Sequence, residues 1–206
     1  TLIDRTLDRL EQAGVKKAVI NIHYKADVLQ AHLSARRAPA ITFSRETELL
    51  DTGGGIARML DFFEGRPFYV IAGDALWDDG PSGDALLRLA RHWQDETMDI
   101  LTLMQPLNRM TLTHGLGDYD LLPDGRVKRS LAKSGAYMWT NIRINHPRLF
   151  EGTPDGAFSF LDLMDKAERA GRFYALEHNG NWHHISTPAD LERVQDAYAA
   201  QARQAS

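Results

Sequence analysis

The stretch Leu49–Asp79, LLDTGGGIARMLDFFEGRPFYVIAGDALWDD, decides the fold. It predicts a glycine loop, then a helix, then a buried strand that ends on a carboxylate. Gly53, Gly54 and Gly55 lack a Cβ, so their backbone N–H groups can approach a ligand closely. Apolar residues follow the glycine triplet at helical spacing. The triplet is therefore expected at a helix N-terminus, where unpaired N–H groups suit a phosphate or a base carbonyl.

The carboxylate at the end of this stretch predicts the place of a site. Phe68–Ala72, FYVIA, is an apolar run typical of a strand covered on both faces, and Gly73 and Asp74 end it. Ligands of open α/β sheets lie beyond the carboxyl ends of strands, where Asp74 would meet a metal-bound phosphate. A plain turn and a capping carboxylate remain the simpler interpretations of the two features taken singly, but their order, with one helix between them, favours a site.

The composition excludes several classes of partner. The chain has 206 residues, 43% of them hydrophobic, and a net charge of −4, which favours neither nucleic acid nor an anionic membrane as partner. It has no cysteine, so neither a disulfide framework nor a thiolate metal site is available, which fits a cytoplasmic protein. No apolar run approaches the roughly 20 residues of a membrane helix, and no signal peptide is visible.

Strand and helix patterns alternate along the chain, which predicts an α/β fold. We expect a Rossmann-like mixed, mainly parallel sheet with helices on both faces, in a single domain 1–206 with a nucleotide-binding half (1–104) and a sugar-phosphate-binding half (105–206). Because the chain opens at Thr1 on a helical pattern, we also expect an N-terminal strand and loop to be absent from it. The predicted helices are 1–10, 26–33, 56–63, 86–93, 159–171 and 188 onward; the predicted strands are 18–22, 41–43, 68–72, 99–104, 117–121, 126–129, 137–144, 173–176 and 182–185.

Five segments resemble a known family in their order along the chain. The sequence is similar to the sugar-1-phosphate nucleotidyltransferases, or nucleotide-sugar pyrophosphorylases, above all to bacterial uridylyltransferases acting on N-acetylmuramate 1-phosphate in cell-wall recycling and to related mannose-1-phosphate guanylyltransferases. The segments are VINIHYKADVLQAHL at 19–33, LLDTGGGI at 49–56, PFYVIAGDALWDD at 67–79, GLGDYDLLPDGRVKR at 115–129 and GNWHHISTPADL at 180–191.

The resemblance implies a reaction of a sugar 1-phosphate with a nucleoside triphosphate, giving a nucleotide sugar and pyrophosphate. It also implies roles for single residues, with Asp74 as the catalytic residue and the ligand of Mg²⁺. It places the sugar phosphate at Asn141 and Trp182. The nucleotide would lie against Thr52, Gly53, Gly54, Gly55 and Gly73.

Two departures from the family pattern matter. The opening glycine-rich loop with its arginine and lysine, which grips the triphosphate in the family, is absent. Position 184 is His where the pattern has a metal-binding Asp, and a neutral imidazole is a poor ligand for Mg²⁺. His184 would then bind phosphate or a softer metal, or one metal ligand would suffice.

Other polar and aromatic side chains have plainer interpretations. Asp78, Asp79 and Lys133 read as solvated loop residues, and His23 and Tyr24 as structural residues at a strand end. The two tryptophans, Trp139 and Trp182, could line a sugar site, although core packing is usual for this residue.

Three classes of function are compared. A transferase needs no general base, because the sugar phosphate is already an anion at pH 7, and positioning with charge neutralisation suffices. This agrees with the absence of a catalytic triad. A binding module that holds a nucleotide or nucleotide sugar without converting it is the alternative, because the phosphate loop is lacking. A dinucleotide-dependent oxidoreductase is disfavoured, since no GxGxxG follows the first strand. Oligomeric state is left open.

Overall fold

The fold is organised around one long strand, β8, with three strands paired directly to it. The computed structural model describes residues 1–204. The main sheet has the order β7-β6-β8-β5-β9, and β3 pairs with β8 beside this path. The β8 ladders to β3, β5 and β6 are antiparallel, and β5 pairs with β9 in parallel. β1 and β2 form a separate parallel pair, and β4 and β10 an antiparallel one.

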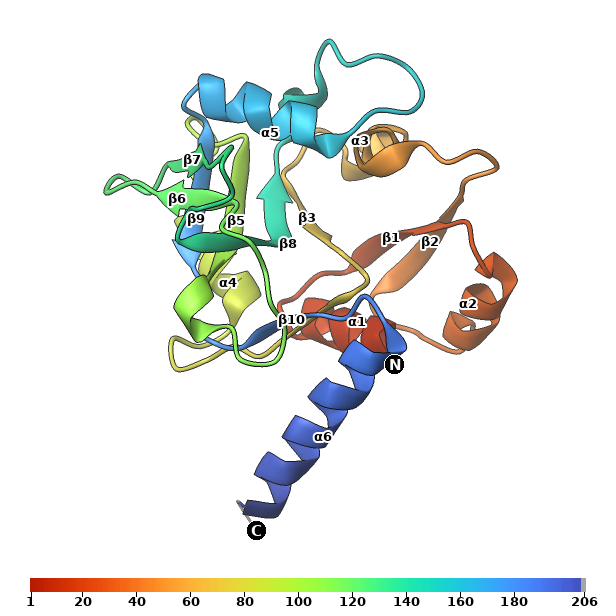
Figure 1. The fold of residues 1–206 in the computed structure, drawn as a ribbon. Helices are drawn as coiled ribbons and strands as arrows, with labels where there is room; N and C mark the ends of the chain where they lie inside the picture. Colours follow the sequence, from red (N-terminus) through yellow and green to blue (C-terminus); the bar gives the residue numbers. More distant parts are fainter. Residues whose placement is uncertain (205–206) are drawn as a thin grey trace.

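Helices cover both faces of this sheet (Figure 1). On one face α3, α5 and two short 3₁₀ turns pack on a cluster centred on Phe68, Phe150 and Phe173. On the other face α4, together with β4 and β10, packs on a cluster that contains Trp77, Leu103 and Trp182, and α1 packs against it. Burying apolar side chains on both faces stabilises a three-layer arrangement.

Most elements lie close to the positions that the sequence predicts. Ser159 caps α5, and Thr187 forms a reciprocal cap with Asp190 at the start of α6, as expected. The helices are α1 (Leu2–Gln12), α2 (Ala26–Leu33), α3 (Asp51–Ala57), α4 (Ala85–His92), α5 (Phe160–Arg169) and α6 (Pro188–Gln204), with 3₁₀ turns η1 (Leu60–Phe63), η2 (Leu107–Arg109) and η3 (Pro147–Phe150); the strands are β1 (Lys17–Ile22), β2 (Ala40–Arg45), β3 (Phe68–Ile71), β4 (Ala75–Trp77), β5 (Ile100–Pro106), β6 (Tyr119–Leu121), β7 (Val127–Arg129), β8 (Tyr137–Asn145), β9 (Phe173–Glu177) and β10 (Trp182–His184).

Two predictions need correction. The α/β class, the mixed sheet and the helices on both faces are confirmed, but antiparallel ladders outnumber parallel ones among the described strands, because β8 enters between β3 and β5 in the opposite direction. The glycine triplet is not a loop before a helix. Gly53, Gly54 and Gly55 lie inside α3, which ends at Ala57, and the expected continuation to residue 63 is the 3₁₀ turn η1.

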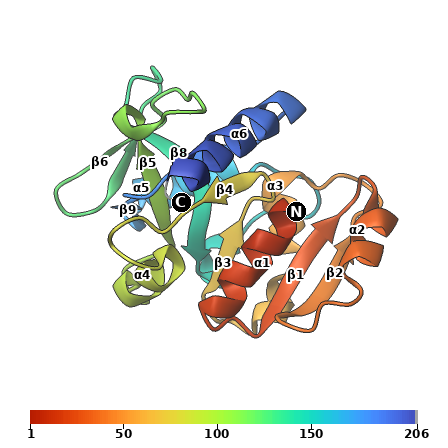
Figure 2. The same ribbon diagram turned by 90° about the horizontal axis from the view of Figure 1, so that it is seen from below.

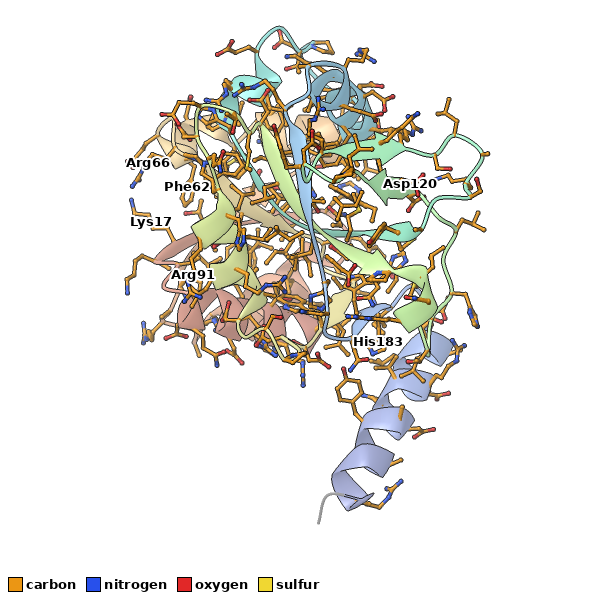
Figure 3. The ribbon with its side chains drawn as sticks, turned by 90° about the vertical axis from the view of Figure 1, so that its left-hand side faces the viewer. Lys17, Phe62, Arg66, Arg91, Asp120 and His183 are labelled. Carbon is orange, nitrogen blue, oxygen red and sulfur yellow. The ribbon has the colours of Figure 1, made fainter. Side chains whose placement is uncertain are left out.

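A deep slot separates β1 from β3. Among residues 1–204, neither strand pairs on the side that faces the other. The space between them is a cavity of about 940 Å³, lined largely by apolar side chains of both strands and of the helices beside them. α1 lies over the slot (Figure 2), with Ile3, Leu7 and Leu10 in its wall. Lys17, the first residue of β1, and Phe62 also line the slot; Figure 3 labels both side chains. With an unpaired strand edge on each side and an apolar lining, the slot is suited to one further β-strand.

We expect a strand placed in this slot to stabilise the fold. α1 runs back along β1, so a parallel strand in the slot would end on the side of the sheet where α1 begins, in the usual crossover arrangement. A chain extended before Thr1 by a short linker and a six-residue Val/Ile strand should show a higher Tm by about 5 °C, because unpaired edges and apolar surface become buried. The measurement is thermal unfolding by circular dichroism.

An extension of equal length with proline at alternate positions is the control, because proline cannot donate to a β-ladder. Equal melting temperatures for the two extended chains would show that the slot does not accept a strand.

Candidate functional site

The predicted metal residues, Asp74 and His184, lie side by side. Asp74 follows the end of β3, in the turn that leads into β4, where the Ala75 N–H donates to the Ala72 carbonyl. The β4–β10 ladder pairs Ala75 with His184, and the backbone N–H of Ile185 donates to the Asp74 carbonyl. Nε2 of His184 lies 2.9 Å from Oδ2 of Asp74, and each side chain is nearly half exposed. The long separation of these residues in the sequence is therefore closed by one short ladder.

The donor set fits one magnesium ion held by one carboxylate. Mg²⁺ prefers oxygen ligands and usually keeps several waters or phosphate oxygens, which a single exposed carboxylate such as that of Asp74 allows. The imidazole of His184 fits less well, because Nε2 is already within hydrogen-bond distance of Asp74 and of Ser186 Oγ, at 3.2 Å. Among the described residues no group of three His, Cys, Asp or Glu side chains could hold a metal. His184 is therefore placed to hydrogen-bond the Asp74 carboxylate.

The glycine triplet acts as a packing surface. The N–H groups of Gly53 and Gly54 donate to the carbonyl of Phe158, at 2.9 and 3.3 Å. The expectation that these N–H groups are free to bind a nucleotide base is therefore wrong. A Cβ on Gly54 would lie 2.1 Å from the carbonyl oxygen of Gly156, and one on Gly53 would meet the Phe158 ring. α3 can approach the segment before α5 because these positions carry no side chain. Gly55 differs, since with Gly73 it lines the large slot.

Contacts connect the glycine helix to Asp74. The Thr52 hydroxyl accepts a hydrogen bond from the backbone N–H of Phe160, at 3.0 Å, so it serves the join of α3 and α5. The Phe160 ring lies under the guanidinium of Arg143, which donates to the Asn141 side chain. The Asn141 carbonyl accepts from the N–H of Ala72, two residues before Asp74. The glycines and the carboxylate therefore border one region of the molecule.

Asn141 occupies a distorted position in β8. The pairing of β8 with β5 shifts between Thr102 and Met104, so β8 carries extra residues there, and Asn141 adopts a left-handed backbone with φ +60°. Asparagine tolerates this conformation better than most residues. Such bulges and left-handed residues cluster at functional sites. The predicted sugar-phosphate residue lies at the strained point of the strand.

Trp182 is a core residue. It is buried and pairs with Trp77 across the β4–β10 ladder, so packing replaces the predicted sugar contact. Its ring stacks near that of His184, with 6.1 Å between centroids. Trp139 is half-buried against Phe173 and Arg143.

Side chains predicted to be solvated are engaged. Asp78 accepts from the backbone and side chain of Asn181, and Asp79 accepts from Arg9 and from the N–H of Ala85 at the start of α4. Lys133 pairs with Asp118 at 2.5 Å. His23 is structural as expected and contacts the Glu46 carbonyl, whereas Tyr24 is 81% exposed.

The sequence does not reveal one buried polar residue that contacts Asn141. Arg143 is 2% exposed, and burial lowers its pKa to about 9, which leaves it charged at neutral pH. An arginine within YMWTNIRIN does not reveal whether it faces solvent or core. The aromatic residues that cover it, Trp139 and Phe160, come from separate elements.

Comparisons with known proteins place the chain among sugar-nucleotide enzymes. It is 34% identical over 193 residues to N-acetylmuramate alpha-1-phosphate uridylyltransferase of Caulobacter vibrioides, covering 91% of this chain and 79% of that protein. It is 28% identical to the enzyme of that name from Neisseria meningitidis serogroup B, with 94% and 83% covered. A solved UDP-glucose pyrophosphorylase complexed with UDP-glucose shares the fold, at a TM-score of 0.74 and 14% identity, with 97% and 87% covered. No family model matches the chain.

Two glycine substitutions should test the close packing at α3. Gly54→Ala places a Cβ against the Gly156 carbonyl, so we expect a loss of about 1–3 kcal/mol in the free energy of unfolding. Gly73→Ala is the matched control, because no atom lies within 4 Å of its added Cβ and its φ is not positive. Urea unfolding measures both, and an unchanged stability of Gly54→Ala would contradict close packing at α3.

Proposed function

Since the chain belongs to the sugar-1-phosphate nucleotidyltransferase family, we propose that it joins UTP and N-acetylmuramate 1-phosphate, giving the nucleotide sugar and pyrophosphate. The 34% identity to a protein named N-acetylmuramate alpha-1-phosphate uridylyltransferase supports the choice of both substrates. N-acetylmuramate is a peptidoglycan sugar, so the reaction would serve cell-wall recycling in the cytoplasm. Among the described residues, no helix is long and apolar enough to cross a membrane.

One observation carries the proposal. Asp74 follows a strand whose last residues pair with the Asn141 bulge, at the end of the slot where Gly55 and Gly73 lie. In this proposal residues 1–104 bind the nucleotide, with Gly55 and Gly73 nearest to it, and residues 105–206 bind the sugar phosphate through Asn141. Thr52, Gly53 and Gly54 would hold α3 in place beside the nucleotide by packing, because the Thr52 hydroxyl and the N–H groups of both glycines are already hydrogen-bonded.

The reaction requires alignment and charge neutralisation. A phosphate oxygen of the sugar phosphate attacks the α-phosphorus of UTP, a new P–O bond forms, and the bond to the departing pyrophosphate breaks. Mg²⁺, held by Asp74, would supply positive charge to the triphosphate. Asp74 is held in place by the His184 side chain and by its own carbonyl's bond to Ile185. Asn141, whose carbonyl accepts from the Ala72 N–H close to Asp74, would orient the sugar phosphate. The attacking oxygen is already an anion at pH 7 and needs no base.

A substrate panel tests the proposal. Pyrophosphate release is measured with UTP, GTP and dTTP, each combined with N-acetylmuramate, glucose and mannose 1-phosphates in the presence of Mg²⁺. The proposal predicts the highest kcat/KM for UTP with N-acetylmuramate 1-phosphate. Tight UTP binding with no turnover of any pair would favour the nucleotide-binding module instead.

Substitutions at Asp74 and His184 should have unequal effects. We expect Asp74→Asn to lower kcat/KM by about 100- to 1,000-fold, because the charge on which Mg²⁺ binding depends is lost. His184→Ala should cost about 10-fold, because it removes only a group that orients the carboxylate. Steady-state kinetics at saturating Mg²⁺ measure kcat/KM for both variants. An equal loss of kcat/KM in the two variants would contradict the assignment of Asp74 as the metal ligand.

A further inference from the structure

Arg143 is a buried cation for which the described residues supply no counter-ion. Its side chain is 2% exposed, and no carboxylate among the described residues lies within the 4.0 Å of an ion pair. Buried arginines are normally paired, because an uncompensated charge in the interior is costly. A fold retains such a group at a cost in stability, so the role of Arg143 calls for an explanation beyond packing.

Two aromatic rings and one amide surround the guanidinium. The guanidinium carbon lies 3.9 Å from the centroid of Phe160 and 5.4 Å from that of Trp139, which favours a cation. Nη1 donates to Oδ1 of Asn141, whereas Nε has no partner. Within the described part of the chain, the acceptor for this buried charge is therefore the carboxamide of the predicted sugar-phosphate residue, Asn141.

The guanidinium determines which way the Asn141 carboxamide faces. Arginine carries only donors, so it can hold the oxygen of an amide but not the nitrogen. With Oδ1 bound inward, Nδ2 and its two N–H groups face the opposite way. Asn141 is only partly buried, and no acceptor for Nδ2 is present among the described residues. The left-handed backbone and the bond from the Ala72 N–H hold the residue in place.

On the basis of the proposed function, we propose that Arg143 is a positioning residue that fixes Asn141 as a hydrogen-bond donor to the anionic oxygens of the sugar phosphate. Arg143 touches no substrate in this account, and it acts through the amide that it orients. Its uncompensated charge also favours an anion at the outer side of Asn141. Asn141 and Arg143 would thus select a sugar that carries a phosphate, while Asp74 would serve the nucleotide.

Asn141→Asp tests the proposal because it separates stability from affinity. A carboxylate at this position pairs with Arg143, so Tm should be unchanged or higher. It also replaces the donor by a negative charge, so the Kd for N-acetylmuramate 1-phosphate should rise by about 10-fold or more, while the Kd for UTP changes less than about 2-fold. Calorimetric titration of each ligand with the full chain measures both constants.

Three further variants complete the test. Asn141→Gly keeps the left-handed backbone and removes the amide, so it should show the same loss of affinity even if Asn141→Asp fails to fold. Arg143→Met should weaken sugar-phosphate binding without lowering Tm, because it replaces an unpaired charge by an apolar side chain. Arg148→Met is the matched control: it breaks the pair with Asp99, at 2.6 Å, and should lower Tm while leaving sugar-phosphate affinity unchanged.

The outcomes distinguish this inference from the proposed function. If the wild type binds N-acetylmuramate 1-phosphate and the Asn141 and Arg143 variants bind it equally well, the positioning role is wrong and the transferase proposal stands. If the wild type binds no sugar 1-phosphate in the panel, the proposed function is contradicted, and this inference with it.

Discussion

The pairing of β3 with β8 is the constraint on which the site depends. β3 is short, and its last residues are held by an antiparallel neighbour, including the bond from the Ala72 N–H to the Asn141 carbonyl. This ladder fixes where β3 ends, and therefore where Asp74 leaves the sheet. It also places the bulge of β8 beside that end. A carboxylate and a strained asparagine, far apart in the sequence, are brought to one place by backbone hydrogen bonds.

The second constraint is close approach between α3 and the segment before α5. Three glycines in a helix lower its intrinsic stability, by about 1 kcal/mol each relative to alanine. The fold accepts this cost because Gly53 and Gly54 contact the Phe158 and Gly156 backbones directly. The approach brings Thr52 to the first turn of α5, and Phe160 in that turn covers Arg143. Packing at the glycines thus contributes to the environment of Asn141.

The sequence predicts the strands and helices well and the site in part. Apolar runs such as Phe68–Ala72 are readable because burial on both faces leaves few polar residues. The glycine triplet was misread as a loop, since tertiary packing overrides helix propensity there. The β4 strand was missed because its three residues follow directly on the turn at Gly73 and Asp74, which reads as the end of the preceding strand. Arg143 was missed for another reason: its burial is decided by Trp139 and Phe160, which the local pattern does not bring together.

The central claim is that Asp74, together with Gly55 and Gly73 at the end of the slot where β1 and β3 finish, forms one Mg²⁺-dependent nucleotide site. The most direct test is calorimetric titration of UTP with and without Mg²⁺, on the wild type and on Asp74→Ala. We expect Mg²⁺ to lower the Kd of the wild type for UTP by about 10-fold or more and to leave the Kd of Asp74→Ala for UTP unchanged. An equal effect of Mg²⁺ on both proteins would show that the nucleotide and its metal bind elsewhere.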